Sequence, residues 1–210
     1  MVSDMRIYEF SCLLNKFQHV QNWDYCDVLF EALAQHYGLE TSWLDITSDF
    51  KIALFFACCH FQEGKWKPLT REQTEVDENH QYGMIFHMPS YIMTLRWYSE
   101  LKKFATATNK VIEYKPDGNP YKYESLKYPN FTGLPQNLIY PLGFQPFMRC
   151  HMQNGYGIYM RDEQPLQSDN DFEKLRFIHS EELSNWIFEE MKGGELVYPH
   201  EGLKQVEFLI

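Results

Sequence analysis

The chain has 210 residues, of which 44% are hydrophobic, and this length and composition suit one well-packed domain. The formal net charge is −10 at pH 7 and no basic cluster is visible, which argues against binding to a nucleic-acid backbone. The sequence has no signal-peptide pattern and no apolar run near the ~20 residues that span a bilayer. We therefore expect a cytoplasmic protein that does not contact membranes.

The cysteines argue against a metal site. There are five of them, an odd number, and no Cys-x-x-Cys pair occurs. A structural zinc ion needs four ligands at suitable spacing, which the sequence does not offer. We expect buried thiols in a reducing compartment and no bound metal.

Two helices are expected before residue 40. Phe10, Leu13, Leu14 and Phe17 recur at helical spacing. A second helix is expected over residues 24–36, where Gly38 suits the left-handed turn that commonly follows a helix.

The next stretch places polar groups at the ends of apolar elements. Residues 41–46 are rich in aromatic and β-branched side chains, which predicts a short strand. Thr47, Ser48 or Asp49 can then cap a helix. Its expected apolar face comprises Ile52, Phe55, Phe56 and Cys59. The polar residues expected to converge on a cleft at these element ends are His36, Tyr37, Asp45, Thr47 and Ser48.

The middle of the chain alternates between polar and aromatic stretches. Residues 62–80 predict a surface loop or hairpin, residues 83–88 a buried strand, and Ser90 the cap of a helix to about residue 104. A short strand is expected at 110–113. Residues 115–146 are rich in proline and aromatics, and they fit either a lid over a pocket or a flap packed by its own side chains.

The last part of the chain predicts a strand and a helix. Residues 174–179 predict the strand. Ser180 is then the expected cap of a helix that ends at Gly193 and Gly194.

Residues 33–57, LAQHYGLETSWLDITSDFKIALFFA, resemble the central motif of the FRG domain. The usual form of that motif is LAQHYGLPTRLLDWT followed by a helix that ends in ALxFA. This sequence differs at Glu40, at Ser42-Trp43 and at Ile46. Arg149, Gln153, Gly155 and Tyr156, together with the stretch LVYPHEGL, are similar to later parts of the family. The resemblance implies a strand within residues 145–159 that carries Arg149 and Gln153. Glycines inside such a strand indicate a bulge or the close approach of a ligand. The resemblance predicts an FRG-like domain at 28–203, after an N-terminal helical segment at 1–27 and before a tail at 204–210.

The Phe-Arg-Gly motif that gives the family its name has no counterpart upstream of the HYGL stretch. We expect that this segment is missing or that another protein chain provides it.

The resemblance implies an α+β fold in which one or more mostly antiparallel sheets are flanked by helices, with a distant similarity to the Arg–Ser–Glu plan of ADP-ribosyltransferases. It implies NAD as the substrate. In this interpretation Asp45 and Gln153 are catalytic, and His36, Tyr37, Gly38, Thr47, Ser48 and Arg149 bind the nucleotide. A bound diphosphate needs a cation or a helix N-terminus, and an oxocarbenium-like transition state needs a nearby carboxylate.

Two functions from different classes remain open. The first is an NAD-dependent ADP-ribosyltransferase or NAD glycohydrolase, such as a toxin or a defence effector. The second is a non-catalytic module that binds a nucleotide-like small molecule or a protein partner. Gln153 stands where the transferase plan has a glutamate, and an amide cannot offset a developing positive charge as a carboxylate does. The same polar residues also fit purely structural roles as helix caps and buried acceptors.

Overall fold

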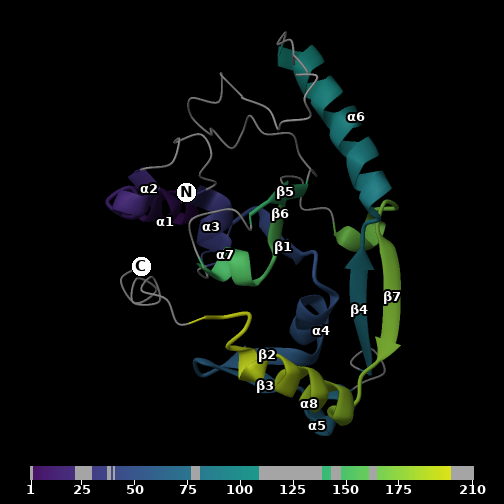
Figure 1. The fold of residues 1–210 in the computed structure, drawn as a ribbon. Helices are drawn as coiled ribbons and strands as arrows, with labels where there is room; N and C mark the ends of the chain where they lie inside the picture. The colour runs from purple at the N-terminus through teal and green to yellow at the C-terminus, as the bar shows by residue number, and fades with distance from the viewer. Residues whose placement is uncertain are drawn as a thin grey trace.

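The computed structural model describes residues 2–21, 30–36, 39, 41–76, 81–108, 139–142, 148–160 and 165–199. The helices are α1 (Val2–Leu14), α2 (Gln18–Gln21), α3 (Phe30–His36), α4 (Phe50–Cys58), α5 (Arg71–Thr74), α6 (Ser90–Thr108), α7 (Met148–Met152) and α8 (Glu181–Glu190), with 3₁₀ turns η3 (Leu166–Ser168) and η4 (Lys192–Gly194). The strands are β1 (Trp43–Thr47), β2 (Cys59–Gln62), β3 (Lys65–Pro68), β4 (Tyr82–His87), β5 (Ile139–Pro141), β6 (Gly155–Tyr159) and β7 (Glu173–Ile178). The predicted α+β class is confirmed (Figure 1).

Within the described ranges the strands form three small antiparallel sheets. The first has the order β1-β6-β5, the second pairs β2 with β3, and the third pairs β4 with β7. In the first sheet Asp45 lies opposite Gly157, and Tyr140 lies opposite the same glycine from the other side. The sequence therefore brings together strands that are far apart along the chain, as Figure 1 shows for β1 and β6.

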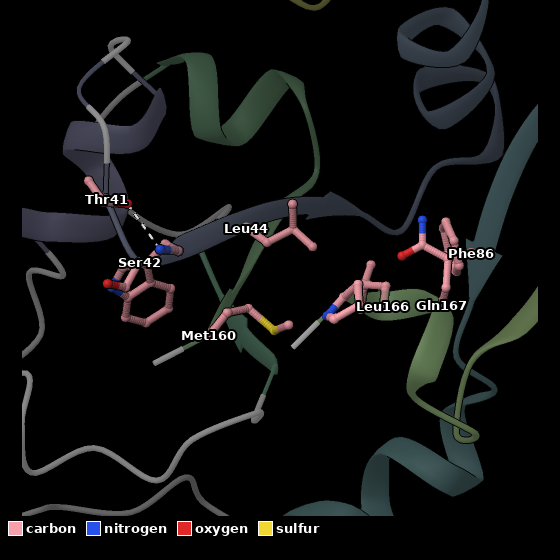
Figure 2. A pocket seen from close by; sticks show the side chains of 9 residues that line it. Thr41, Ser42, Leu44, Phe86, Met160, Leu166 and Gln167 are labelled. Atoms are coloured by element: carbon pink, nitrogen blue, oxygen red, sulfur yellow. Dashed lines mark hydrogen bonds between the residues drawn. The ribbon is translucent and has the colours of Figure 1, made fainter. Parts of the chain in front are cut away.

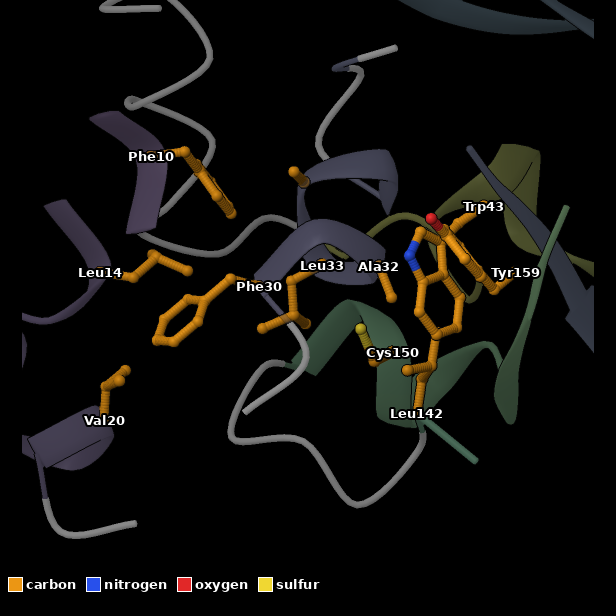
Figure 3. Close-up of a cluster of buried hydrophobic side chains, with 11 residues drawn as sticks. Phe10, Leu14, Val20, Phe30, Ala32, Leu33, Trp43, Leu142, Cys150 and Tyr159 are labelled. Carbon is orange, nitrogen blue, oxygen red and sulfur yellow. The ribbon is translucent and has the colours of Figure 1, made fainter. Parts of the chain in front are cut away.

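The three-stranded sheet separates two clusters of buried side chains. Because side chains alternate along a strand, Trp43 faces one side of the sheet and Ile46 the other. Trp43 packs with Tyr159, at 5.6 Å between ring centres, at one end of a cluster that extends through Leu33 to Phe10 and draws on α1, α3 and α7 (Figure 3). Ile46 packs against a second cluster built on Ile139, Ile158 and Phe172. Buried clusters thus lie on both faces of the sheet, and they hold Trp43 and Ile46 of β1 in place.

Helix α4 begins at a single well-defined cap. Asp49 Oδ1 accepts hydrogen bonds from the backbone N–H groups of Lys51 (2.8 Å) and Ile52 (3.4 Å). Asp49 was one of three predicted caps, and Thr47 and Ser48 do not cap this helix. The predicted apolar face is partly wrong, because the helix ends at Cys58 and Cys59 already belongs to β2. Phe56 is 42% exposed, whereas Leu54, which the spacing did not select, is buried.

The predicted strand at 145–159 is wrong in its first part. Residues Met148–Met152 form α7, a turn follows at Gln153 and Asn154, and only Gly155–Tyr159 is strand. The physical reason lies in the turn: Gln153 N–H donates to Arg149 O, as in a helix, and Asn154 adopts a left-handed conformation with φ 44° that ends it. Arg149 is therefore a helix residue and Gln153 a turn residue.

Other predicted elements are confirmed with shifted ends. The polar stretch 62–80 contributes to the β2–β3 hairpin and to α5, and Ser180 caps α8 through a hydrogen bond from Leu183 N–H. Strand β4 alternates between buried and exposed residues, because only one of its faces is covered. The predicted strand at 110–113 and most of the stretch 115–146 lie outside the described residues. None of the helices that the structure describes is long and apolar enough to cross a membrane.

Candidate functional site

The centre of the predicted site is the paired stretch of β1 and β6. Asp45 lies in the middle of β1, on the face that also carries Trp43 and Thr47. The opposite residue in β6 is Gly157, where an added Cβ would lie 2.7 Å from Trp43 Cε3 and 3.2 Å from Leu142 Cδ1. Gly157 therefore permits the close approach of the Trp43 indole, which a larger residue at this position would prevent.

Asp45 is an exposed residue of β1 that is nevertheless surrounded by protein atoms on several sides. Desolvation by this surrounding protein raises the pKa of Asp45 to about 7, and the positive charge of Arg149 acts in the opposite direction. Because the side chain still reaches solvent, the site is open and is not an enclosed part of the core. A carboxyl group with this pKa exchanges its proton near neutral pH.

Arg149 is the cation whose charge acts on the Asp45 carboxyl group. It lies in α7 and is fully buried, with 0% of its surface exposed. Its guanidinium carbon lies 3.5 Å from the centre of the Tyr198 ring, the distance of a direct cation–π stack. A buried guanidinium needs nearby negative charge or polarisable groups, and Asp45 and Tyr198 provide one of each.

Gln153 and Thr47 connect β1 to the C-terminal part of the described chain. Thr47 Oγ1 donates to Gln153 O at 2.7 Å and accepts from Asp49 N–H at 3.0 Å. The side chain of Gln153 is buried, and its Nε2 donates to Val197 O at 2.8 Å. These bonds hold the start of α4, the turn after α7 and residue 197 in one hydrogen-bonded chain.

The start of α4 offers less to an anion than the sequence suggests. Two backbone N–H groups of the first turn are already bonded to the Asp49 carboxylate, and that carboxylate carries the negative charge that a helix N-terminus favours. Ser48 is exposed, and its N–H donates to Asn154 O at 3.3 Å. The first turn of α4 therefore has fewer N–H groups left for an anion than the sequence suggests.

The structure brings four of the predicted site residues into one neighbourhood, namely Asp45, Thr47, Arg149 and Gln153. Ser48 adjoins it through its backbone. His36 is the last residue of α3, and its side chain lies outside what the structure describes, as do Tyr37 and Gly38. Among the described residues, no group of three or more His, Cys, Asp or Glu side chains is placed to hold a metal ion.

A separate pocket of about 440 Å³ lies at the start of β1. In Figure 2 the side chains of Leu44, Met160 and Leu166 point toward a shared space, with Phe86 and Gln167 further along it. Its lining residues are Thr41, Ser42, Trp43, Leu44, Phe86, Met160, Pro165, Leu166 and Gln167. None of the predicted site residues that the structure describes lines this pocket, so the pocket and the Asp45–Arg149 pair are distinct features.

Sequence reasoning missed Tyr198 and Val197 as parts of the site. The only signal was their place in the LVYPHEGL stretch, which resembles the end of the family motif. Nothing local to that stretch indicates that its tyrosine stacks on an arginine of α7.

The comparison with protein families gives one result. Residues 5–65 match the FRG domain. The FRG match covers less than a third of the chain, begins inside α1 and ends at the start of β3, so it includes Asp45 and Thr47 but not Arg149 or Gln153. No curated protein and no solved structure matches the chain.

Proposed function

We propose that this FRG-domain protein binds NAD or a related dinucleotide at the Asp45–Arg149 pair. One observation carries the proposal: the carboxyl group of Asp45, titrating near neutral pH, lies within the electrostatic reach of the buried Arg149 guanidinium. Sites that act on charged substrates commonly place such a perturbed carboxyl beside a cation.

Arg149 suits the diphosphate of NAD, and Asp45 suits the ribose that carries the nicotinamide. The guanidinium fork of Arg149 matches the oxygens of a diphosphate. The Asp45 carboxylate can accept hydrogen bonds from ribose hydroxyls and can stabilise positive charge on the sugar. The first turn of α4 takes no part in this assignment, because Asp49 occupies its N–H groups.

If the site is catalytic, the reaction is cleavage of the nicotinamide–ribose bond. The bonding electron pair leaves with nicotinamide, the sugar passes through an oxocarbenium-like state beside Asp45, and water or an acceptor side chain adds to the sugar carbon. Only the ionised form of Asp45 stabilises that positive charge. The rate of nicotinamide release should therefore rise with pH through about 7.

Binding without turnover is the second candidate, and the place of Gln153 favours it. Its amide donates to Val197 O and is buried, so this residue acts by holding the chain together and has no carboxylate to offer. In this case the protein would be a nucleotide-binding or partner-binding module of the non-catalytic kind.

The test is a titration of the purified protein with NAD by calorimetry, with free nicotinamide followed by NMR. Binding with release of nicotinamide, abolished in Asp45→Asn but retained in the exposed control Glu190→Gln, supports the enzyme. Binding without release supports the non-catalytic module. If NAD does not bind at all, the assignment of a dinucleotide to this site is wrong.

A further inference from the structure

Arg149 is closed off from solvent on one side by the ring of Tyr198. The guanidinium stacks on that ring at 3.5 Å and has no exposed surface, whereas Tyr198 itself is partly exposed. The ring therefore lies between the cation and the solvent. An anionic ligand cannot reach the covered face of Arg149 while the ring stays in this position.

The peptide that joins Val197 to Tyr198 is held at both of its polar groups. Val197 is fully buried and its carbonyl accepts the hydrogen bond from Gln153 Nε2. Tyr198 N–H donates to Gly194 O at 2.8 Å. The segment can therefore stay in place while rotation about the side-chain bonds of Tyr198 moves the ring off the face of the guanidinium that it covers.

The ring has other aromatic surface to rest against. Its centre lies 5.6 Å from that of Phe61 and 6.4 Å from that of Trp66, both on the β2–β3 hairpin. Phe61 is 47% exposed, so this side of the hairpin is open to solvent. Aromatic pairs at these separations attract one another, so both contacts favour the position of the ring over the guanidinium.

We propose that Tyr198 is a gate over an anion site at Arg149, and that the ring moves aside when a diphosphate binds. The proposal rests on the proposed function for the identity of that diphosphate, as part of a dinucleotide. Hydrogen bonds from a guanidinium to phosphate are stronger than its stacking on a partly solvated phenol ring. The closed arrangement is the resting state, and the anchored backbone returns the ring when the ligand leaves.

The affinity of the full-length protein for inorganic pyrophosphate, measured by calorimetry, tests this gate. Tyr198→Ala removes the competing ring, and we expect it to bind pyrophosphate about threefold to tenfold more tightly than the wild type. Tyr198→Phe keeps the ring and should bind as the wild type does. The matched control is Tyr82→Ala, because Tyr82 also stacks on an arginine, Arg176, at 3.5 Å. Its removal should leave the affinity unchanged.

The gain in Tyr198→Ala must depend on Arg149, so it should vanish in the double variant Tyr198→Ala/Arg149→Gln. Equal or weaker affinity in Tyr198→Ala, or no binding of pyrophosphate to either protein, would overturn the gate.

A measurement on the wild type avoids any folding defect of the variants. The guanidinium carbon of Arg149 lies 3.5 Å from the centre of the Tyr198 ring, so we expect the ring current to shift the Nε–H proton bonded next to it upfield. Saturating pyrophosphate should return this NMR signal toward the value of a free arginine. If the signal keeps its shift while pyrophosphate binds, the ring has not moved and the proposal is wrong.

These results separate the gate from the proposed function. The affinity for pyrophosphate tests the gate, and the binding of NAD tests the proposed function. A protein that shows the Tyr198 effect but does not bind NAD has an anion gate for another ligand. One that binds NAD equally well with and without the ring has the function but no gate.

Discussion

Two arginines of this protein stack on tyrosines at the same distance and in opposite surroundings. Arg149 lies 3.5 Å from the Tyr198 ring and is fully buried. Arg176 lies 3.5 Å from the Tyr82 ring on the β4–β7 sheet, where the arginine is exposed and the tyrosine is 37% exposed. The two distances are identical, so distance alone does not say which pair has a role beyond local packing.

The difference lies in what surrounds each cation. Water solvates Arg176, and its charge is screened within a short distance. Arg149 is held out of water, so its field reaches Asp45 and opposes the rise in the pKa of that carboxyl group. A buried cation beside a titrating carboxyl is the arrangement on which the proposed site at the Asp45–Arg149 pair rests.

The largest effect should come from removing the buried cation. Arg149→Met leaves Asp45 without its compensating charge and loses the stack on Tyr198, which we expect to lower the free energy of unfolding by about 3 kcal/mol. Arg176→Met, at the exposed stack, should have a far smaller effect. Urea unfolding of both variants measures this contrast, and equal losses would show that burial does not distinguish the two pairs.

Removal of the tyrosine ring should also destabilise the protein more at the buried stack than at the exposed stack. Tyr198→Ala loses the stack and the ring contacts with Phe61 and Trp66, so we expect a cost of about 2 kcal/mol in thermal or urea unfolding. Tyr82→Ala removes an exposed ring and should cost less. A larger loss of stability in Tyr82→Ala than in Tyr198→Ala would contradict the expectation that the buried stack contributes more.

Gln153→Ala tests whether the buried stack depends on its backbone anchor. The substitution leaves Val197 O without its donor at 2.8 Å, which we expect to cost about 1 kcal/mol of stability. It should also loosen the segment that carries Tyr198, seen as faster hydrogen exchange at the amide of Tyr198. Unchanged exchange would show that the anchor and the stack are independent. Gln62→Ala, an exposed residue of β2, is the control.

The smallest effect concerns pH. An unfolded aspartate titrates near pH 4, about three units below the pKa of about 7 in the folded protein. The folded state therefore holds this proton more tightly, and the stability that it contributes is present below about pH 4 and lost as the pH rises through about 7. Because solvent reaches Asp45, we expect the change to be modest.

The measurement compares the unfolding of wild type and Asp45→Asn across this range. The variant cannot titrate, so its advantage over the wild type should grow between about pH 4 and pH 7 and then stay constant. A difference that does not vary with pH would mean that Asp45 has an ordinary pKa.

The sequence predicts the elements whose signals are local. Hydrophobic spacing indicates α1, the β-branched run around Ile46 indicates β1, and the acidic residue before Phe50 marks the start of α4. Helix α7 could not be predicted in this way. It is short, and the family motif favoured a strand, whereas the left-handed turn at Asn154 decides where the strand begins.

The site depends on contacts that no local pattern contains. Asp45 was identified by its place at the end of a predicted strand, and Arg149 and Gln153 by a resemblance. Their proximity follows from the pairing of β1 with β6, and the stack on Tyr198 from the return of the chain past α7. Burial of Arg149 could not be read from its residue type, since arginine is seldom fully buried.

The position of β1 at one end of the sheet order β1-β6-β5 has a consequence for how the protein is made. Thr47 and the residue it bonds, Gln153, are 106 positions apart, so β1 leaves the ribosome long before its partner strand exists. Contacts this distant along the chain slow folding. The segment 5–65 that matches the FRG domain contains β1 but not β6. Synthesised alone, it should remain an incomplete folding unit whose unpaired strand invites aggregation.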